Sequence, residues 1–95
     1  MVAGTSAVRL RIAGHVQGVG YRAWLADEAL GNGLRGWVRN RRDGSVEAVL
    51  IGASDAVEAV IALCARGPRL AHVSGVERTA AADDGCSGFS LLPTP

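Results

Sequence analysis

The sequence predicts an α+β fold in which an antiparallel sheet carries two helices on one of its faces. Two observations predict it. Segments with apolar residues at every second position are interleaved with segments in which apolar residues recur at helical spacing. An Asp-Gly pair joins the two middle strand segments, which is typical of a β-hairpin. The resulting order is strand, helix, strand, strand, helix, strand, with a short extra strand, and this is the split β-α-β or ferredoxin-like arrangement.

The first half of the chain supplies a strand, a helix and a second strand. Residues 8–12 alternate apolar side chains with arginines, and Gly14 is expected to end this strand. Residues 21–29 have apolar side chains at helical spacing, and the Gly-Asn-Gly run at 31–33 is typical of a helix end. Residues 34–40 then read as a short strand.

The second half of the chain supplies a strand, a helix and two further strands. Residues 45–51 are rich in valine and isoleucine and predict a strand that Gly52 breaks. Asp55 and Glu58 predict a capping box at the start of a helix that ends before the Arg-Gly-Pro run at 66–68. A fourth strand is expected over 71–79, then a small polar connection over 80–88 and a last short strand over 89–92.

Composition limits the class of protein. The 95 residues predict a single domain over 1–95, with an ordered core over about 7–92. Hydrophobic residues make up 48% of the chain, and the formal net charge is +1, so no basic excess points to nucleic acid or to an anionic membrane. All ten basic residues are arginine, which excludes a lysine nucleophile. Cys64 and Cys86 show no metal-binding spacing, and two free thiols are the expectation.

The N-terminal segment and the hydropathy pattern bear on localisation. Residues 1–6 lack the apolar stretch of a secretory signal, and no apolar run approaches the length of a membrane span. We therefore expect a cytoplasmic protein, and a monomer is the expectation for a chain of this size.

The stretch His15-Val16-Gln17-Gly18-Val19-Gly20-Tyr21-Arg22 lies where the first strand should end and the first helix should begin. The first amides of a helix lack intrahelical partners, and glycines let consecutive N–H groups curve around one anion. The fork of donors on Arg22 could grip two phosphate oxygens. Turn glycines beside a solvated arginine are the structural alternative, and Tyr21 and Trp24 are expected to anchor the helix in the core.

Asn40 ends the second strand just before the hairpin. Its amide could approach the anion loop from the side and orient a water molecule, because an amide both donates and accepts hydrogen bonds. A local turn contact is the alternative. The neighbouring Arg39, Arg41 and Arg42 could steer anions inward, but a solvated hairpin tip is the expectation for them.

The two stretches Gly14–Arg22 (GHVQGVGYR) and Gly36–Val46 (GWVRNRRDGSV) resemble the two signatures of the acylphosphatase family, with every fixed position present and the usual interval between them. Gly67-Pro68, Val73 and Phe89 also lie where that family tends to have them, so the resemblance covers about residues 8–91. It implies metal-independent and cofactor-free hydrolysis of small acyl phosphates to a carboxylate and inorganic phosphate.

The resemblance also implies roles for individual residues. Arg22 and Asn40 would be catalytic: Arg22 binds the phosphate and Asn40 orients the attacking water. The phosphate-binding backbone amides would be those of Val16, Gln17, Gly18, Val19, Gly20, Tyr21 and Arg22. His15 occupies a variable motif position and receives no role, and neither His72 nor the Asp83-Asp84 pair suggests a metal site. A non-catalytic phosphate-binding module remains the alternative, and an RNA-binding domain is disfavoured because few aromatic residues are available for stacking.

Overall fold

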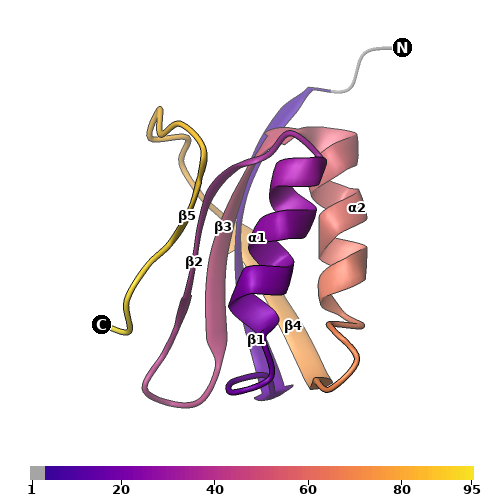
Figure 1. Ribbon diagram of the computed structural model, residues 1–95. Coiled ribbons are helices and arrows are strands. Elements are labelled where there is room, and N and C mark those ends of the chain that lie inside the picture. Colours follow the sequence, from indigo (N-terminus) through magenta and orange to yellow (C-terminus); the bar gives the residue numbers. More distant parts are fainter. Residues whose placement is uncertain (1–3) are drawn as a thin grey trace.

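The computed structural model describes residues 4–95 as five strands and two helices built around one sheet (Figure 1). In chain order the elements are β1 (Thr5–His15), α1 (Tyr21–Gly31), β2 (Arg35–Asn40), β3 (Val46–Ala53), α2 (Ser54–Cys64), β4 (His72–Ala80) and β5 (Phe89–Leu91). The strand order is β4-β1-β3-β2-β5. Both helices cover the same face of the sheet, so the predicted ferredoxin-like α+β fold is confirmed.

The sheet is mixed rather than purely antiparallel. The pairs β1–β3, β1–β4 and β2–β3 are antiparallel, as expected, but β5 runs parallel to β2 at the sheet edge. The connection over 81–88 makes this possible because it carries the chain from β4, at one edge, to β5 at the other. Arg35 anchors the connection, since its guanidinium donates to both carboxylate oxygens of Asp83 and to the carbonyl of Cys86.

Two strands run beyond the glycines that were expected to end them. β1 continues through Gly14 to His15, with a register shift between Ala13 and Gly14 where it pairs with β4. A Cβ atom at Gly14 would collide with the carbonyl oxygen of His72, so glycine serves a close approach of two strands at this position. β3 likewise continues past Gly52, whose missing side chain makes room for Leu34.

The capping box predicted for α2 is wrong. The helix begins at Ser54, one residue before Asp55, and its N-cap residue Ala53 has no side chain that could accept a hydrogen bond. Instead, the Ser54 N–H donates to the carbonyl of Gly4 at 2.8 Å. Glu58 turns away from the helix start and accepts two hydrogen bonds from Arg78 of β4. The hydrogen bond from Ser54 to Gly4 thus takes the place of a side-chain cap.

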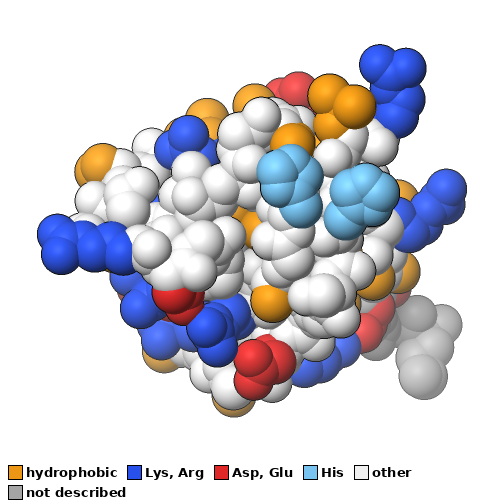
Figure 2. Space-filling view, turned by 90° about the horizontal axis from the view of Figure 1, so that it is seen from below, with side chains coloured by type: hydrophobic (Ala, Val, Ile, Leu, Met, Phe, Trp, Pro, Cys, Tyr) orange, Lys and Arg blue, Asp and Glu red, His pale blue; other side chains and the backbone are white. Residues whose placement is uncertain are grey.

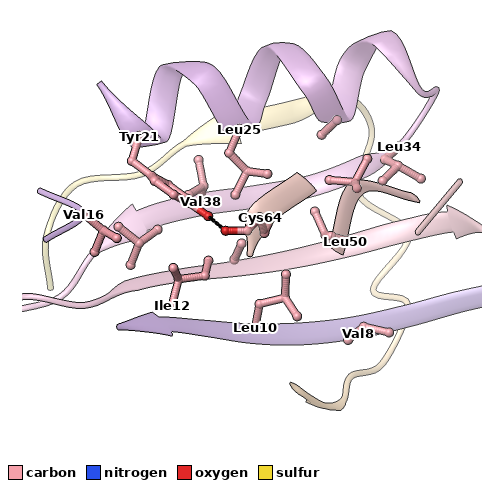
Figure 3. Packing of buried hydrophobic residues seen from close by; sticks show 14 of the residues in the cluster. Val8, Leu10, Ile12, Val16, Tyr21, Leu25, Leu34, Val38, Leu50 and Cys64 are labelled. Atoms are coloured by element: carbon pink, nitrogen blue, oxygen red, sulfur yellow. Dashed lines mark hydrogen bonds between the residues drawn. The ribbon is translucent and has the colours of Figure 1, made fainter. Parts of the chain in front are cut away.

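The core lies between the sheet and the helices (Figure 3). Leu10 and Ile12 of β1 meet Leu50 of β3 and the helix side chains, and all are fully buried. Each such side chain stabilises the fold by about 1.5–3 kcal/mol. The Tyr21 hydroxyl donates to the carbonyl of Cys64 at 2.7 Å and so ties the start of α1 to the end of α2. This contact fixes the start of α1, which follows the loop over residues 16–20.

The N-terminal segment and the length of the helices bear on the expected localisation. Residues 1–3, part of the segment expected to carry no secretory signal, lie outside the described residues. Within residues 4–95, neither helix is long and apolar enough to cross a membrane.

Candidate active site

The loop between β1 and α1, residues 16–20, lies at the lower end of the molecule in Figure 1. Gly18 and Gly20 have φ angles of 74° and 78°, which side chains rarely adopt, so the loop curves sharply. Gly20 is the N-cap of α1, and no side chain caps the helix. Within residues 4–95, none of the backbone N–H groups of residues 16–22 donates a hydrogen bond to the chain. The loop therefore offers a series of free donors at a helix N-terminus.

Arg22 differs from the other half-buried arginines in having no partner. Arg35 pairs with Asp83, while Arg39 and Arg41 both donate to Glu47. In the part of the chain that the structure describes, the guanidinium of Arg22 makes no ion pair and no hydrogen bond, although it lies in the first turn of α1 beside the free amides. An unpaired guanidinium beside free backbone amides is suited to binding an anion.

Asn40, at the end of β2, lines the same cavity as Arg22. This cavity of about 230 Å³ is lined by loop residues, the start of α1, the end of β2 and one residue of β5: Val16, Gly18, Gly20, Tyr21, Arg22, Ala23, Asn40 and Leu91. Within residues 4–95, the Asn40 side-chain amide has no hydrogen-bond partner, so it is free to hold a water or a ligand atom. The size suits a small substrate rather than a nucleotide.

The arginines that flank Asn40 in the sequence do not line this cavity. Arg39 and Arg41 donate to the same carboxylate oxygen of Glu47 at 2.8 and 2.9 Å, on the sheet face opposite the helices. Burial acts to raise the pKa of Glu47, but hydrogen bonds and charge from the two arginines outweigh it and lower the pKa overall. Arg42 donates to the carbonyl of Pro95. Because Arg39 and Arg41 both pair with Glu47, neither anion steering nor a solvated hairpin tip describes these two arginines.

A larger hollow of about 460 Å³ lies on that open face. Its cations Arg9, Arg11 and Arg41 all face carboxylates, with N···O distances of 2.6–3.6 Å. The Arg11–Asp43 pair is the shortest of these contacts at 2.6 Å. Because its charges are already matched, this hollow is a poorer anion site than the cavity beside Arg22.

The remaining side chains singled out in the sequence have structural positions. Tyr21 and Trp24 pack edge to face with ring centroids 5.3 Å apart, as expected for anchors of α1. Burial raises the pKa of the Tyr21 hydroxyl and raises that of the Cys64 thiol to about 12. Cys64 and Cys86 are both free thiols. His15 pairs with His72 across β1 and β4, and the two imidazoles lie side by side on the lower end of the molecule (Figure 2).

The sequence did not indicate the side-chain role of Gln17, and it did not indicate Ala23 or Leu91 as residues of the cavity. Gln17 was expected to contribute only its backbone amide, but its side chain also bonds to the hairpin. Its position in the glycine-rich stretch was the only signal. Leu91 was not expected in the cavity at all, because its place depends on the parallel pairing of β5 with β2, which no local pattern reveals.

Comparison with known proteins identifies the family. The acylphosphatase family model matches residues 8–91. A curated acylphosphatase of Azorhizobium caulinodans is 52% identical over 91 residues, which covers 95% of this chain and 98% of the relative. Among solved structures, an acylphosphatase from Bacillus subtilis superposes with a TM-score of 0.89 at 31% identity, covering 94% of this chain and 99% of its own.

A second solved structure agrees. An acylphosphatase from Coxiella burnetii superposes with a TM-score of 0.89 at 30% identity, and 93% of each chain is covered. The match with the family model, the near full-length relative and both solved structures lead to the same family. This chain belongs to the acylphosphatases, a family of hydrolases that act on acid anhydrides.

Proposed function

We propose that the cavity beside Arg22 hydrolyses the carboxyl–phosphate bond of small acyl phosphates, with Arg22 and Asn40 as its catalytic residues and no metal or cofactor. One observation carries the proposal. An arginine without a protein partner and a run of free backbone amides share a cavity with an asparagine amide that is also free. Donors for a phosphate and a polar group for a water thus line one cavity, from the loop and the start of α1 on one hand and from the end of β2 on the other.

The phosphate is held by the loop and by Arg22. Phosphoryl transfer spreads charge over three equatorial oxygens, so its catalysis consists mostly of positioning and electrostatic stabilisation. The amides of residues 16–22 supply donors from one side, and the Arg22 guanidinium supplies a planar fork that can grip two oxygens. A desolvated set of fixed donors stabilises this charge without reorganising during the reaction.

Asn40 positions the attacking water in line with the leaving oxygen. The leaving group is a carboxylate, which departs readily, so strong general-base catalysis is less necessary than for a phosphate monoester. Among residues 4–95, no carboxylate or imidazole lines the cavity. We infer that a phosphate oxygen of the substrate accepts the proton from water. A pH–rate profile that requires an ionising enzyme group near neutrality would contradict this route.

The test is hydrolysis of benzoyl phosphate by the purified chain in excess chelator, compared with Arg22→Ala and Asn40→Ala. We expect metal-independent turnover by the unaltered chain. Asn40→Ala should lower kcat on the order of 10²-fold, as for a lost transition-state donor, while the inhibition constant of inorganic phosphate changes little. Arg22→Ala should weaken phosphate binding as well as turnover. Circular dichroism establishes that both variants are folded.

The opposite outcome also has a definite meaning. If the folded, unaltered chain binds phosphate but hydrolyses no acyl phosphate, the site is a non-catalytic phosphate-binding module. Equal loss of phosphate affinity and turnover in Asn40→Ala would make Asn40 a binding residue instead.

We also propose that the chain acts as a single-domain monomer in the cytoplasm. The radius of gyration of 12.3 Å is that of one compact domain. Both cysteines within residues 4–95 are free, which fits a reducing compartment. Sedimentation as a dimer at micromolar concentration would contradict the monomer, and detection in a secreted fraction would contradict the location.

A further inference from the structure

The side chain of Gln17 links the loop that precedes α1 to the hairpin that follows Asn40. Its amide nitrogen donates to the carbonyl oxygen of Arg41 at 2.7 Å and to that of Ser45 at 2.9 Å. Arg41 follows Asn40 directly in the chain. We propose, on the basis of the proposed function, that Gln17 is a positioning residue that sets the distance between the phosphate loop and the water-orienting Asn40.

The sheet itself does not hold these two segments together. β1 pairs with β3 only as far as Ile12↔Val46, and from Ala13 onward it pairs with β4 alone. Asn40 pairs with Val46 on the far side of β3. The loop after His15 is therefore not held by the pairing of β2 with β3, where Asn40 lies. Within residues 4–95, the two bonds of Gln17 are the only hydrogen bonds that connect residues 16–22 with the hairpin.

The chemistry of a primary amide suits this connection. Gln17 uses both of its N–H groups on two carbonyls, so the orientation of the amide is set by its partners. Those carbonyls stand at the base of the hairpin, where the Arg41 N–H also donates to the Ser45 carbonyl at 2.8 Å. Holding both carbonyls fixes the backbone on both sides of the turn. The Asn40 amide is thereby fixed relative to the bound phosphate.

The reaction needs this distance to be constant. The loop and Arg22 locate the phosphorus atom, and Asn40 locates the water, so the in-line arrangement depends on two separate segments. A misplacement of about 1 Å between reacting groups can cost on the order of 10²-fold in rate. Loss of the bridge should therefore lower turnover while the donors that bind phosphate stay in place.

The experiment is a double-mutant cycle with Gln17→Met and Asn40→Ala, measured as kcat on benzoyl phosphate. Methionine keeps the length of the side chain and removes both donors. We expect Gln17→Met to lower kcat about 10-fold, with less than a threefold change in the inhibition constant of inorganic phosphate. In the Asn40→Ala background, Gln17→Met should lower kcat less than about twofold further, because its effect acts through Asn40.

Arg11→Gln is the matched control. Arg11 holds the same hairpin from the open face through Asp43, at 2.6 Å, but has no link to the phosphate loop. This variant should keep kcat within about twofold. Fully multiplicative losses in the double variant, or equal losses of phosphate affinity and kcat in Gln17→Met, would overturn the inference. Absence of any hydrolysis by the unaltered chain would instead overturn the proposed function, so the two failures are distinguishable.

Discussion

At the scale of single residues, Arg22 is distinguished by the partner that it lacks. Seven of the other arginines make hydrogen bonds or ion pairs within residues 4–95, and those without a partner besides Arg22, namely Arg66 and Arg69, are exposed. Arg22 alone combines partial burial with a free guanidinium in this part of the chain. A cation that is shielded from water and unpaired interacts more strongly with an incoming anion than an exposed one does.

Replacement of Arg22 by lysine tests whether the fork or the charge matters. Lysine keeps the positive charge but offers a point ammonium in place of two parallel donors. We expect Arg22→Lys to fold normally and to lose about 10²-fold or more in kcat/KM on benzoyl phosphate. Steady-state kinetics beside a thermal melt would show this. Turnover near that of the unaltered chain would mean that Arg22 does not bind the phosphate through a bidentate contact.

The sequence already indicated most residues of the site. Gly18, Gly20, Arg22 and Asn40 could be singled out because turn glycines and polar functional groups stand in short motifs, and the structure places all four along one cavity. Their roles in binding and catalysis stay predictions. The side-chain bonds of Gln17 could not be predicted in this way, since they join positions on different elements. Leu91 was even harder to predict, because only tertiary pairing brings it to the cavity.

At the scale of elements, β5 completes the cavity. This three-residue strand pairs with β2 and places Leu91 opposite Val38, two residues before Asn40. Leu91 is 53% exposed and lines the cavity. If the cavity binds phosphate as proposed, this exposed leucine offers an apolar surface to the acyl group of the substrate.

Leu91→Ala should therefore discriminate between acyl groups. We expect kcat/KM for benzoyl phosphate to fall about fivefold, equivalent to about 1 kcal/mol of lost apolar contact, while acetyl phosphate changes less than twofold. Leu70→Ala is the control, because Leu70 is also exposed and does not line this cavity. An equal loss on both substrates would show that Leu91 supports the fold of the site rather than contacting the acyl group.

Element types were easier to predict than element ends. The alternation of apolar residues fixed the first strand, and the Asp-Gly pair fixed the hairpin, because both signals are local. Gly14 and Gly52 were read as strand breakers, although they serve close packing against His72 and Leu34. Both errors have the same cause. The sequence does not distinguish a glycine that permits two segments to approach closely from a glycine that permits a turn.

At the scale of the whole molecule, ion pairs tie distant segments together. Arg78 joins β4 to α2, and Arg35 joins β2 to the 81–88 connection. On the open face of the sheet, Arg39 and Arg41 both pair with Glu47. The hydrogen bonds from arginine lower the pKa values of Glu58 and Asp83. The pKa of Asp43 is lowered chiefly by hydrogen bonds from Ser45, with Arg11 adding to it. The folded state therefore favours the ionised form of these carboxyl groups.

Stability should consequently fall in acid. A carboxyl group whose pKa is lower in the folded chain than in the unfolded chain stabilises the fold above its unfolded pKa, about 4, and loses that contribution as the pH falls. We expect the free energy of unfolding, measured by urea titration, to be level near pH 6 and to decrease below about pH 4.5. The difference between the unaltered chain and Glu47→Gln should shrink over the same interval. Parallel pH profiles for the two proteins would contradict a stabilising role of ionised Glu47.

The open N-terminus of α1 also has a consequence for inhibition. In most helices a serine or aspartate at the N-cap, the position that Gly20 occupies here, satisfies the free amides of the first turn. A carboxylate there would, however, occupy the place of the phosphate and compete with it inside the same molecule. The glycine at this position gives up a few tenths of a kcal/mol of helix stability relative to such a cap. On the proposed function, the bound phosphate serves as the cap of the helix, and this cap forms and is lost again with every turnover.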